Sequence, residues 1–336
     1  MSVTSLDPID LATRASAAVA ERFPGAEVSA VTQLVGGTSS LTYAAEMTHD
    51  GDVCRVVIKA APPGLEPVRN RDVLRQARLF DILIDTPAVK VPAVYGTSVG
   101  DPPEVPPLFV MSFIAGESFE PALTAAEPTV SIAELKSRAF EAARMAAALH
   151  AVDVDDPRLS GERVTDLVAE VERWARAFGS VDPDLQEGHE PVRDRLLAML
   201  PASLPPSVLH GDFRLGNMQC NGGNVDGVID WEIWSLGDRR LDLAWFLLNS
   251  DPNHPNSRRS EPLLPEPGEL IGAYEDITGI HIDGLNWFNA LVRYKQAAAS
   301  VLIIKNNRKL PQPGVDIDAM LLGRSRLLDA AMGQLS

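Results

Sequence analysis

The chain has 336 residues, 45% of them hydrophobic, and a mean hydropathy of -0.01, which is typical of a globular protein with room for two lobes. It carries 30 Lys and Arg residues against 46 Asp and Glu residues, and the net charge of -16 argues against a nucleic-acid substrate. Two isolated cysteines, Cys54 and Cys220, argue against a disulfide framework or a zinc cluster. The sequence shows neither a signal peptide nor an apolar run of about 20 residues, so we expect a cytoplasmic protein without membrane contact.

The N-terminal part of the chain combines helix and strand patterns. Apolar residues at helical spacing predict helices over 8–22 and about 70–84. The second helix is expected to bury a face formed by Val73, Leu74, Ala77, Phe80 and Ile84. Strands are predicted on both sides of a Gly/Ser turn within 33–46, and over 53–60, 91–95 and 108–113.

Beyond residue 116 the pattern becomes mainly helical. Helices are predicted near 132–150, 164–178, 189–200, 240–249, 268–277, 284–306 and 317–333. Short strands around 208–230 interrupt them, with a tight hairpin turn at Asn221-Gly222. The segment 251–268 holds five prolines and is expected to be a surface loop.

These patterns predict an α+β fold with two lobes. Residues 1–111 would form a small lobe built on an antiparallel sheet and 117–336 a larger, mainly helical lobe, joined by a connector at 112–116. A cleft between two such lobes is a common place for a ligand.

The segment from His210 to Asn217 reads His-Gly-Asp-Phe-Arg-Leu-Gly-Asn, and Asp230 follows it in Ile-Asp-Trp-Glu. The spacing is that of a kinase catalytic loop, which predicts Asp212 as the base that accepts the proton of an attacking hydroxyl. Asn217 and Asp230 would bind Mg2+, which prefers oxygen ligands, once the predicted hairpin folds the chain back. His210 is expected to brace the loop. The alternative, a surface turn with an unrelated carboxylate, fits poorly with the apolar residues on both flanks.

Lys59 lies in the apolar strand Val-Val-Ile-Lys-Ala, where its ammonium group could contact the phosphates of a nucleotide. The alternative is an edge-strand lysine that faces water. The turn formed by Gly36, Gly37, Thr38, Ser39 and Ser40 could close over the phosphates through its N–H and O–H groups, or could be an ordinary hairpin turn. Two later carboxylates, Asp238 and Asp242, are interpreted as structural, either as helix caps or as a support of the catalytic loop.

With these residues the chain resembles the aminoglycoside phosphotransferase and choline kinase-like family, which has the protein-kinase-like fold. The resemblance runs from about residue 34 to about residue 305 and is strongest in the acyl-CoA-dehydrogenase-associated kinase-like branch. It implies ATP and Mg2+ as cofactors, with GTP left open. The roles that it implies are those of the catalytic residue Asp212, the metal ligands Asn217 and Asp230, the nucleotide lysine Lys59, and backbone contacts of Ser112 and Ile114 with the purine.

The chain departs from the family pattern in two places. The helix after the lysine strand usually supplies a glutamate, whereas here the aligned residue is Gln76, with Asp72 one turn earlier as a substitute. The acidic, aminoglycoside-binding C-terminus of the resistance enzymes is not recognisable. The family name therefore does not identify the acceptor.

The function predicted from the sequence is transfer of the γ-phosphoryl group of ATP, with Mg2+, to a hydroxyl of a small molecule. The alternatives are a nucleotide-binding pseudokinase or regulatory module, and a kinase of a hydroxylated acyl substrate. A protein acceptor is disfavoured because the long activation segment with its Ala-Pro-Glu signature is missing. The aromatic residues Trp231, Trp234 and Trp287 either shape the acceptor site or belong to the core.

Overall fold

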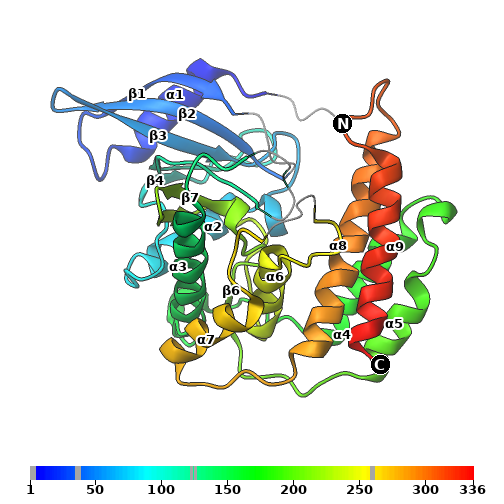
Figure 1. Ribbon diagram of the computed structural model, residues 1–336. Coiled ribbons are helices and arrows are strands. Elements are labelled where there is room, and N and C mark those ends of the chain that lie inside the picture. The colour runs from blue at the N-terminus through cyan, green and yellow to red at the C-terminus, as the bar shows by residue number, and fades with distance from the viewer. Residues whose placement is uncertain (1–4, 35–38, 122–123, 125–126, 258–261) are drawn as a thin grey trace.

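The computed structural model describes residues 5–34, 39–121, 124, 127–257 and 262–336. A five-stranded antiparallel sheet forms the N-terminal region, and helices make up most of the rest (Figure 1). The strands are ordered β1-β2-β3-β5-β4, and their bounds are β1 Glu27–Gln33, β2 Leu41–His49, β3 Asp52–Ala60, β4 Val94–Ser98 and β5 Leu108–Ser112. The predicted α+β arrangement of a sheet-based lobe and a helical lobe is confirmed.

Local sequence explains the best-formed part of the sheet. Asp50 and Gly51 join β2 to β3 with positive φ angles of 52° and 90°, as a two-residue hairpin turn requires. Side chains of β2 alternate between buried and less buried positions, and the buried face packs against the helix α1 (Pro8–Val19). Asp7 caps α1 by accepting a hydrogen bond from the amide of Ile9.

The strand predicted over 91–95 is displaced. β4 begins at Val94, and residues 91–93 lie outside it. Pro92 has no N–H group for the sheet, which explains why the strand starts after it.

The helix α2 (Val73–Leu83) lies between the sheet and the helical lobe. Phe80 meets Phe109 of β5 at 6.0 Å between ring centroids and Trp231 at 6.2 Å. Because α2 is covered on two sides, its buried surface is wider than one stripe and includes Leu79 and Leu83. The predicted face was wrong at Ile84, which follows the helix and is 52% exposed.

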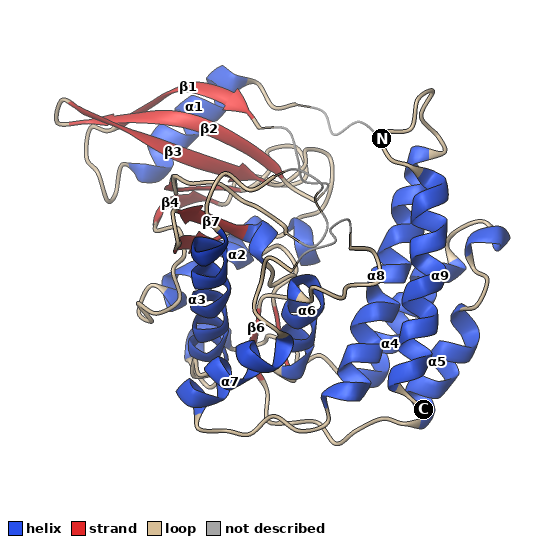
Figure 2. Cartoon of the chain, viewed as in Figure 1, coloured by secondary structure: helices blue, strands red, loops and turns tan. Residues whose placement is uncertain are grey.

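The helical lobe contains two groups of helices (Figures 1 and 2). The first group is α3 (Ile132–His150), α6 (Arg240–Ser250) and α7 (Pro267–Thr278). The second group is α4 (Leu167–Gly179), α5 (His189–Ala198), α8 (Leu285–Asn307) and α9 (Ile317–Gln334). The two groups meet where α6 packs against α8. Two short antiparallel pairs, β6 (Ser207–Leu209) with β9 (Ser235–Gly237) and β7 (Met218–Asn221) with β8 (Asn224–Val228), lie with the first group.

Three hydrophobic clusters hold the molecule together, and α6 belongs to two of them. Phe246 and Leu247 of α6 pack into the cluster around α2, α3 and α7, while Ala244 and Leu248 pack into the cluster of the second helix group. The third cluster joins α1 to the sheet. A helix that is apolar on nearly all sides is expected where two cores meet. Within the described residues, no helix combines the length and the apolar character needed to cross a membrane.

Candidate active site

The segment predicted as the catalytic loop begins directly after the buried strand β6. The carboxylate of Asp242, in the first turn of α6, accepts hydrogen bonds from the amides of His210 at 2.6 Å and Gly211 at 2.8 Å. Burial alone would raise the pKa of Asp242, but His150 and His210 oppose it and the pKa lies below its ordinary value. Asp242 therefore supports the loop as an ionised acceptor.

Gly211 must be glycine at this position. Its φ is +84°, and a Cβ atom would lie 2.7 Å from the carbonyl oxygen of Ile233. The carbonyl oxygen of Gly211 accepts a hydrogen bond of 2.6 Å from the ammonium group of Lys295 in α8. The ammonium group also lies 4.0 Å from the ring centroid of Trp245. The loop is thus held by α6 on one side and by the second helix group on the other.

His210 braces the loop as the sequence led us to expect. Its Nδ1 accepts from the amide of Asp212 at 3.1 Å, so Nε2 carries the hydrogen and donates to the carbonyl oxygen of Ile229 at 2.9 Å. The ring is fully buried, and burial lowers its pKa, which keeps it neutral. His210 therefore ties the catalytic loop to the segment that carries Asp230.

The carboxylate of Asp212 is held by three donors. Trp245 Nε1 donates to Oδ1 at 2.6 Å, Asn217 Nδ2 donates to Oδ2 at 2.7 Å, and Arg214 Nε lies 3.2 Å from Oδ1. The side chain keeps 23% of its surface exposed. The sequence prediction included Asn217 but not Trp245 or Arg214.

Arg214 joins Asp212 to a second carboxylate. Arg214 Nη1 donates to Glu120 Oε2 at 3.0 Å, and the amide of Gly216 donates to the same oxygen at 3.2 Å. A Cβ on Gly216 would lie 2.1 Å from Arg214 Nη1, so the glycine makes room for the guanidinium group. The sequence signal for Arg214 is its place inside the loop motif, whereas nothing in the sequence singles out Glu120.

The predicted metal ligands lie on adjacent segments. The amide of Ile229 donates to the carbonyl oxygen of Asn217 at 2.9 Å, and the β7–β8 hairpin turns at Gly222, which has a φ of +55°. Asn217 and Asp230 both line a cavity of about 310 Å³. Asn217 donates hydrogen bonds from its Nδ2 to Asp212, and no described residue donates to its Oδ1. One amide oxygen and one carboxylate fit Mg2+, which is usually completed by substrate phosphates and water.

The same cavity holds most of the predicted nucleotide contacts. Lys59, Ser40, Ser112 and Ile114 line it. The amide of Ser112 donates to the carbonyl oxygen of Ala93 at 2.9 Å, so only its carbonyl group is left for a purine. Ser39 is buried but does not line the cavity, and Gly36, Gly37 and Thr38 lie outside the described residues.

Lys59 is only 8% exposed, yet among the described residues none forms an ion pair or a hydrogen bond with it. Gln76 is buried, but it lines neither large cavity and its Nε2 finds no partner within the described part of the chain. Asp72 caps α2 instead and lies 3.8 Å from Arg78. Glu232 shares the cavity with Lys59; burial raises the pKa of Glu232, and the positive charge of Lys59 acts in the opposite direction. The sequence prediction did not include Glu232.

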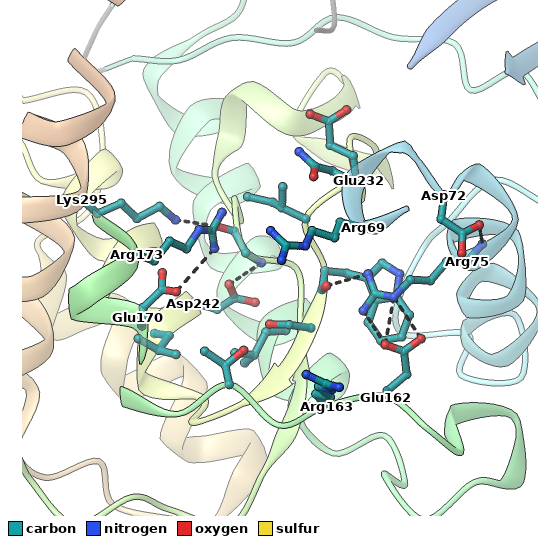
Figure 3. A pocket seen from close by; sticks show the side chains of 18 of the residues that line it. Arg69, Asp72, Arg75, Glu162, Arg163, Glu170, Arg173, Glu232, Asp242 and Lys295 are labelled. Carbon is teal, nitrogen blue, oxygen red and sulfur yellow. Dashed lines mark hydrogen bonds and ion pairs between the residues drawn. The ribbon is translucent and has the colours of Figure 1, made fainter. Parts of the chain in front are cut away.

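A second cavity, of about 550 Å³, lies beside the first and shares Glu232 with it. Gly211 and Trp234 line it. Asp242 and Lys295 line it as well, as Figure 3 shows. Trp231 and Trp287 are core residues instead, with 0% and 5% of their surface exposed.

The model of the phosphotransferase enzyme family matches residues 30–270, which is more than half of the chain. The chain belongs to the phosphotransferase enzyme family. The family expected from the loop motif is thereby confirmed.

Solved structures place this phosphotransferase among proteins of the same fold. A protein from Ralstonia eutropha, described as a candidate aminoglycoside phosphotransferase, matches with a TM-score of 0.71 at 22% identity and covers 90% of this chain and 92% of its own. The aminoglycoside phosphotransferase APH(4)-Ia, solved with AMP-PNP and hygromycin B, matches with a TM-score of 0.61 at 16% identity and covers 94% and 96%. The expected kinase-like α+β fold is confirmed.

Two curated relatives contain a segment similar to this phosphotransferase. "Probable acyl-CoA dehydrogenase IBR3" of Arabidopsis thaliana is 27% identical over 76% of this chain and 34% of the relative. "Acyl-CoA dehydrogenase family member 10" of Mus musculus is 25% identical over 73% of this chain and 24% of the relative. The chain therefore spans about a third and a quarter of their lengths, in agreement with the acyl-CoA-dehydrogenase-associated branch expected from the sequence.

Proposed function

We propose that this phosphotransferase transfers the γ-phosphoryl group of ATP to a hydroxyl group of a small molecule, with Mg2+ as cofactor. The observation that carries the proposal is the joint position of Asp212, Asn217 and Asp230, where Asn217 binds Asp212 and lines one cavity with Asp230. In this proposal residues 1–111 form the nucleotide lobe, 112–116 the connector, and 117–336 the lobe with the catalytic loop and the acceptor site.

Five residues of the site have a task in this proposed reaction. Asp212 orients the acceptor hydroxyl and takes its proton as the new oxygen–phosphorus bond forms and the bond to ADP breaks. Asn217 and Asp230 hold Mg2+, which neutralises charge on the phosphates when it is bound. Lys59 provides a positive charge for the phosphates from β3, and the backbone of Ile114, which lines the same cavity, contacts the purine. Backbone contacts of this kind leave ATP and GTP open.

A nucleotide-binding pseudokinase is the competing function. The absence of a glutamate at the position of Gln76 motivates it, since Lys59 forms no ion pair within the described part of the chain. The complete set of Asp212, Asn217 and Asp230 argues against it, because binding alone does not require a positioned base.

Replacing Asp212 by Asn tests the proposal. The variant should lose at least about a hundredfold in ADP release, because the base is gone, and should bind MgADP nearly as tightly as the wild type. ADP release is measured by a coupled assay and MgADP binding by calorimetry. Asp230→Ala is the matched variant and should weaken MgADP binding instead. Equal ADP release by the wild type and Asp212→Asn would support the pseudokinase.

A hydroxylated acyl compound is the acceptor class that we propose, because both curated relatives are named as acyl-CoA dehydrogenases. Hydroxyacyl compounds should then stimulate ADP release more than hygromycin B does. Stimulation by the aminoglycoside alone would contradict this acceptor class.

A further inference from the structure

The larger cavity, of about 550 Å³, borders the catalytic-loop region. Gly211, which precedes Asp212, lines it, and Glu232 separates it from the nucleotide cavity. Lys295 also lines it and is an electrostatic neighbour of Asp212. Asp212 itself lines neither cavity, but its chain neighbour Gly211 and its electrostatic neighbour Lys295 bring the larger cavity close to the proposed base.

Most charged groups of this cavity neutralise one another. Glu162 forms an ion pair of 2.8 Å with Arg75, whose guanidinium group also stacks on Trp234 at 3.7 Å from the ring centroid. Glu170 and Arg173 approach to 3.4 Å across one turn of α4. Asp72 and Arg78 approach to 3.8 Å, and Asp242 accepts from backbone amides of the catalytic loop.

Two arginines of the cavity remain unpaired. Neither Arg69 nor Arg163 has an ion pair or a side-chain hydrogen bond within the described ranges, and Figure 3 draws both among the lining side chains. Both are exposed, as unpaired arginines often are, but these two border the cavity that reaches Gly211. Lys295 also brings a positive charge to the cavity. Its ammonium group donates to a carbonyl oxygen and lies over an aromatic ring.

The carboxylates of the cavity offer little to a cationic ligand. Glu232 is the one acidic lining residue that has neither an ion pair nor backbone donors in the described part of the chain, and it also borders the nucleotide cavity. The surplus charge in this cavity is positive although the chain as a whole carries -16. Guanidinium groups match the planar fork of a carboxylate or two phosphate oxygens.

We propose that the 550 Å³ cavity binds the acceptor through an anionic group, a carboxylate or a phosphate ester, held by Arg69 and Arg163. The inference deepens the proposed phosphoryl transfer and rests on it for the identity of the acceptor. It separates this protein from kinases whose acceptor is a polycationic aminoglycoside.

The test compares four acceptor fragments of equal carbon number: hydroxybutyrate, hydroxybutyl phosphate, butanediol and aminobutanol. Their binding is measured by ligand-observed NMR on protein saturated with MgADP, so that the nucleotide cavity is already filled. The two anions should bind at least about tenfold more tightly than the diol and the amine, since a charge-assisted hydrogen bond is stronger than a neutral one. Comparison of hydroxybutyrate with hydroxybutyl phosphate shows whether the cavity prefers a carboxylate or a phosphate ester.

Arg69→Gln and Arg163→Gln should each weaken binding of the anions by at least about tenfold and leave MgADP affinity unchanged. Arg71→Gln is the matched control, because Arg71 binds the carbonyl oxygen of Glu66 at 3.0 Å and does not line the cavity. Anion binding that is equal in wild type and both variants, or that is no tighter than binding of the amine, would overturn the proposal.

These measurements involve no turnover. Loss of ADP release in Asp212→Asn decides the proposed reaction, while anion binding in Arg69→Gln and Arg163→Gln decides the cavity. If the protein binds the anions but its ADP release does not depend on Asp212, the proposed reaction is wrong and the anion site is still supported. If the protein phosphorylates only cationic acceptors, the anion site is wrong and the proposed reaction is still supported.

Discussion

Asp212 is oriented by donors from different parts of the chain. Trp245 of α6 holds Oδ1, and Asn217 of the loop itself holds Oδ2. Arg214 lies against both oxygens at 3.2 and 3.3 Å and is held in turn by Glu120. A base fixed in this way needs little reorganisation when a hydroxyl group arrives. Arg214 therefore fixes the carboxylate of Asp212 while Glu120 fixes Arg214.

Arg214→Gln should therefore lower kcat by about ten- to a hundredfold, because Asp212 loses a charged donor that orients its carboxylate. MgADP affinity should change less than about twofold. Steady-state kinetics with calorimetry separates the two effects. Glu120→Gln should give a smaller loss of kcat because it only loosens Arg214. Arg176→Gln, an exposed substitution on α4, is the control, and a kcat for Arg214→Gln that matches it would exclude this role.

At the scale of elements, helices that are remote in sequence hold the catalytic loop. Lys295 of α8 lies 84 residues from Gly211 yet donates to its carbonyl oxygen. The segment after α6 is tied to α8 in the same way, because His254 Nε2 bonds Gln296 at 2.9 Å and His254 Nδ1 accepts from the amide of Asn256. The predicted surface loop at 251–268 is therefore partly buried, with His254 only 3% exposed. The prolines of this segment correctly indicated irregular backbone, but they did not indicate that the segment is exposed.

His254 makes the stability of this segment depend on pH. Burial lowers its pKa from 6.5 to about 4, with Arg293 acting in the same direction and Gln296 and Asp251 opposing. Below pH 6.5 the unfolded chain takes up a proton that the folded chain refuses until about pH 4, so stability falls across this window as pH decreases.

The free energy of unfolding should accordingly contain a His254 contribution that is about 2 kcal/mol smaller at pH 5 than at pH 7. Urea unfolding of wild type and His254→Gln at both pH values measures it, because the variant lacks this titration. An identical pH dependence in wild type and His254→Gln would contradict the prediction.

At the scale of the whole molecule, α6 couples two cores to the site. Its Phe246 packs into one cluster and its Leu248 into another, while Trp245 and Asp242 of the same helix contact the catalytic loop. Packing in either cluster therefore bears on the position of the loop.

Phe246→Ala should lower the free energy of unfolding by about 3 to 5 kcal/mol, because it leaves a cavity in a fully buried site. Urea unfolding at neutral pH measures the loss. Ile9→Ala, at a side chain that is 78% exposed, should change stability by less than about 0.5 kcal/mol. A loss below about 1 kcal/mol for Phe246→Ala would show that α6 is not part of a close-packed core.

The sequence determined the features that depend on short spacing. The loop motif with Asp212 and Asn217, the strand with Lys59 and the hairpin near Asn221 follow from residues that are neighbours in the chain, because local hydrogen bonding and side-chain periodicity specify them. Helix bounds such as those of α3, predicted over 132–150 and observed at Ile132–His150, follow for the same reason.

Only the tertiary structure decided which side chains complete the site. Glu120 is 94 residues from Arg214, and Trp245 is 33 residues from Asp212. Arg69 and Arg163 reach one cavity from different lobes. Contacts of this kind leave no periodicity in the sequence, because they are set by how elements pack against one another. The proposed acceptor site rests on such contacts, whereas the proposed reaction rests on the motif.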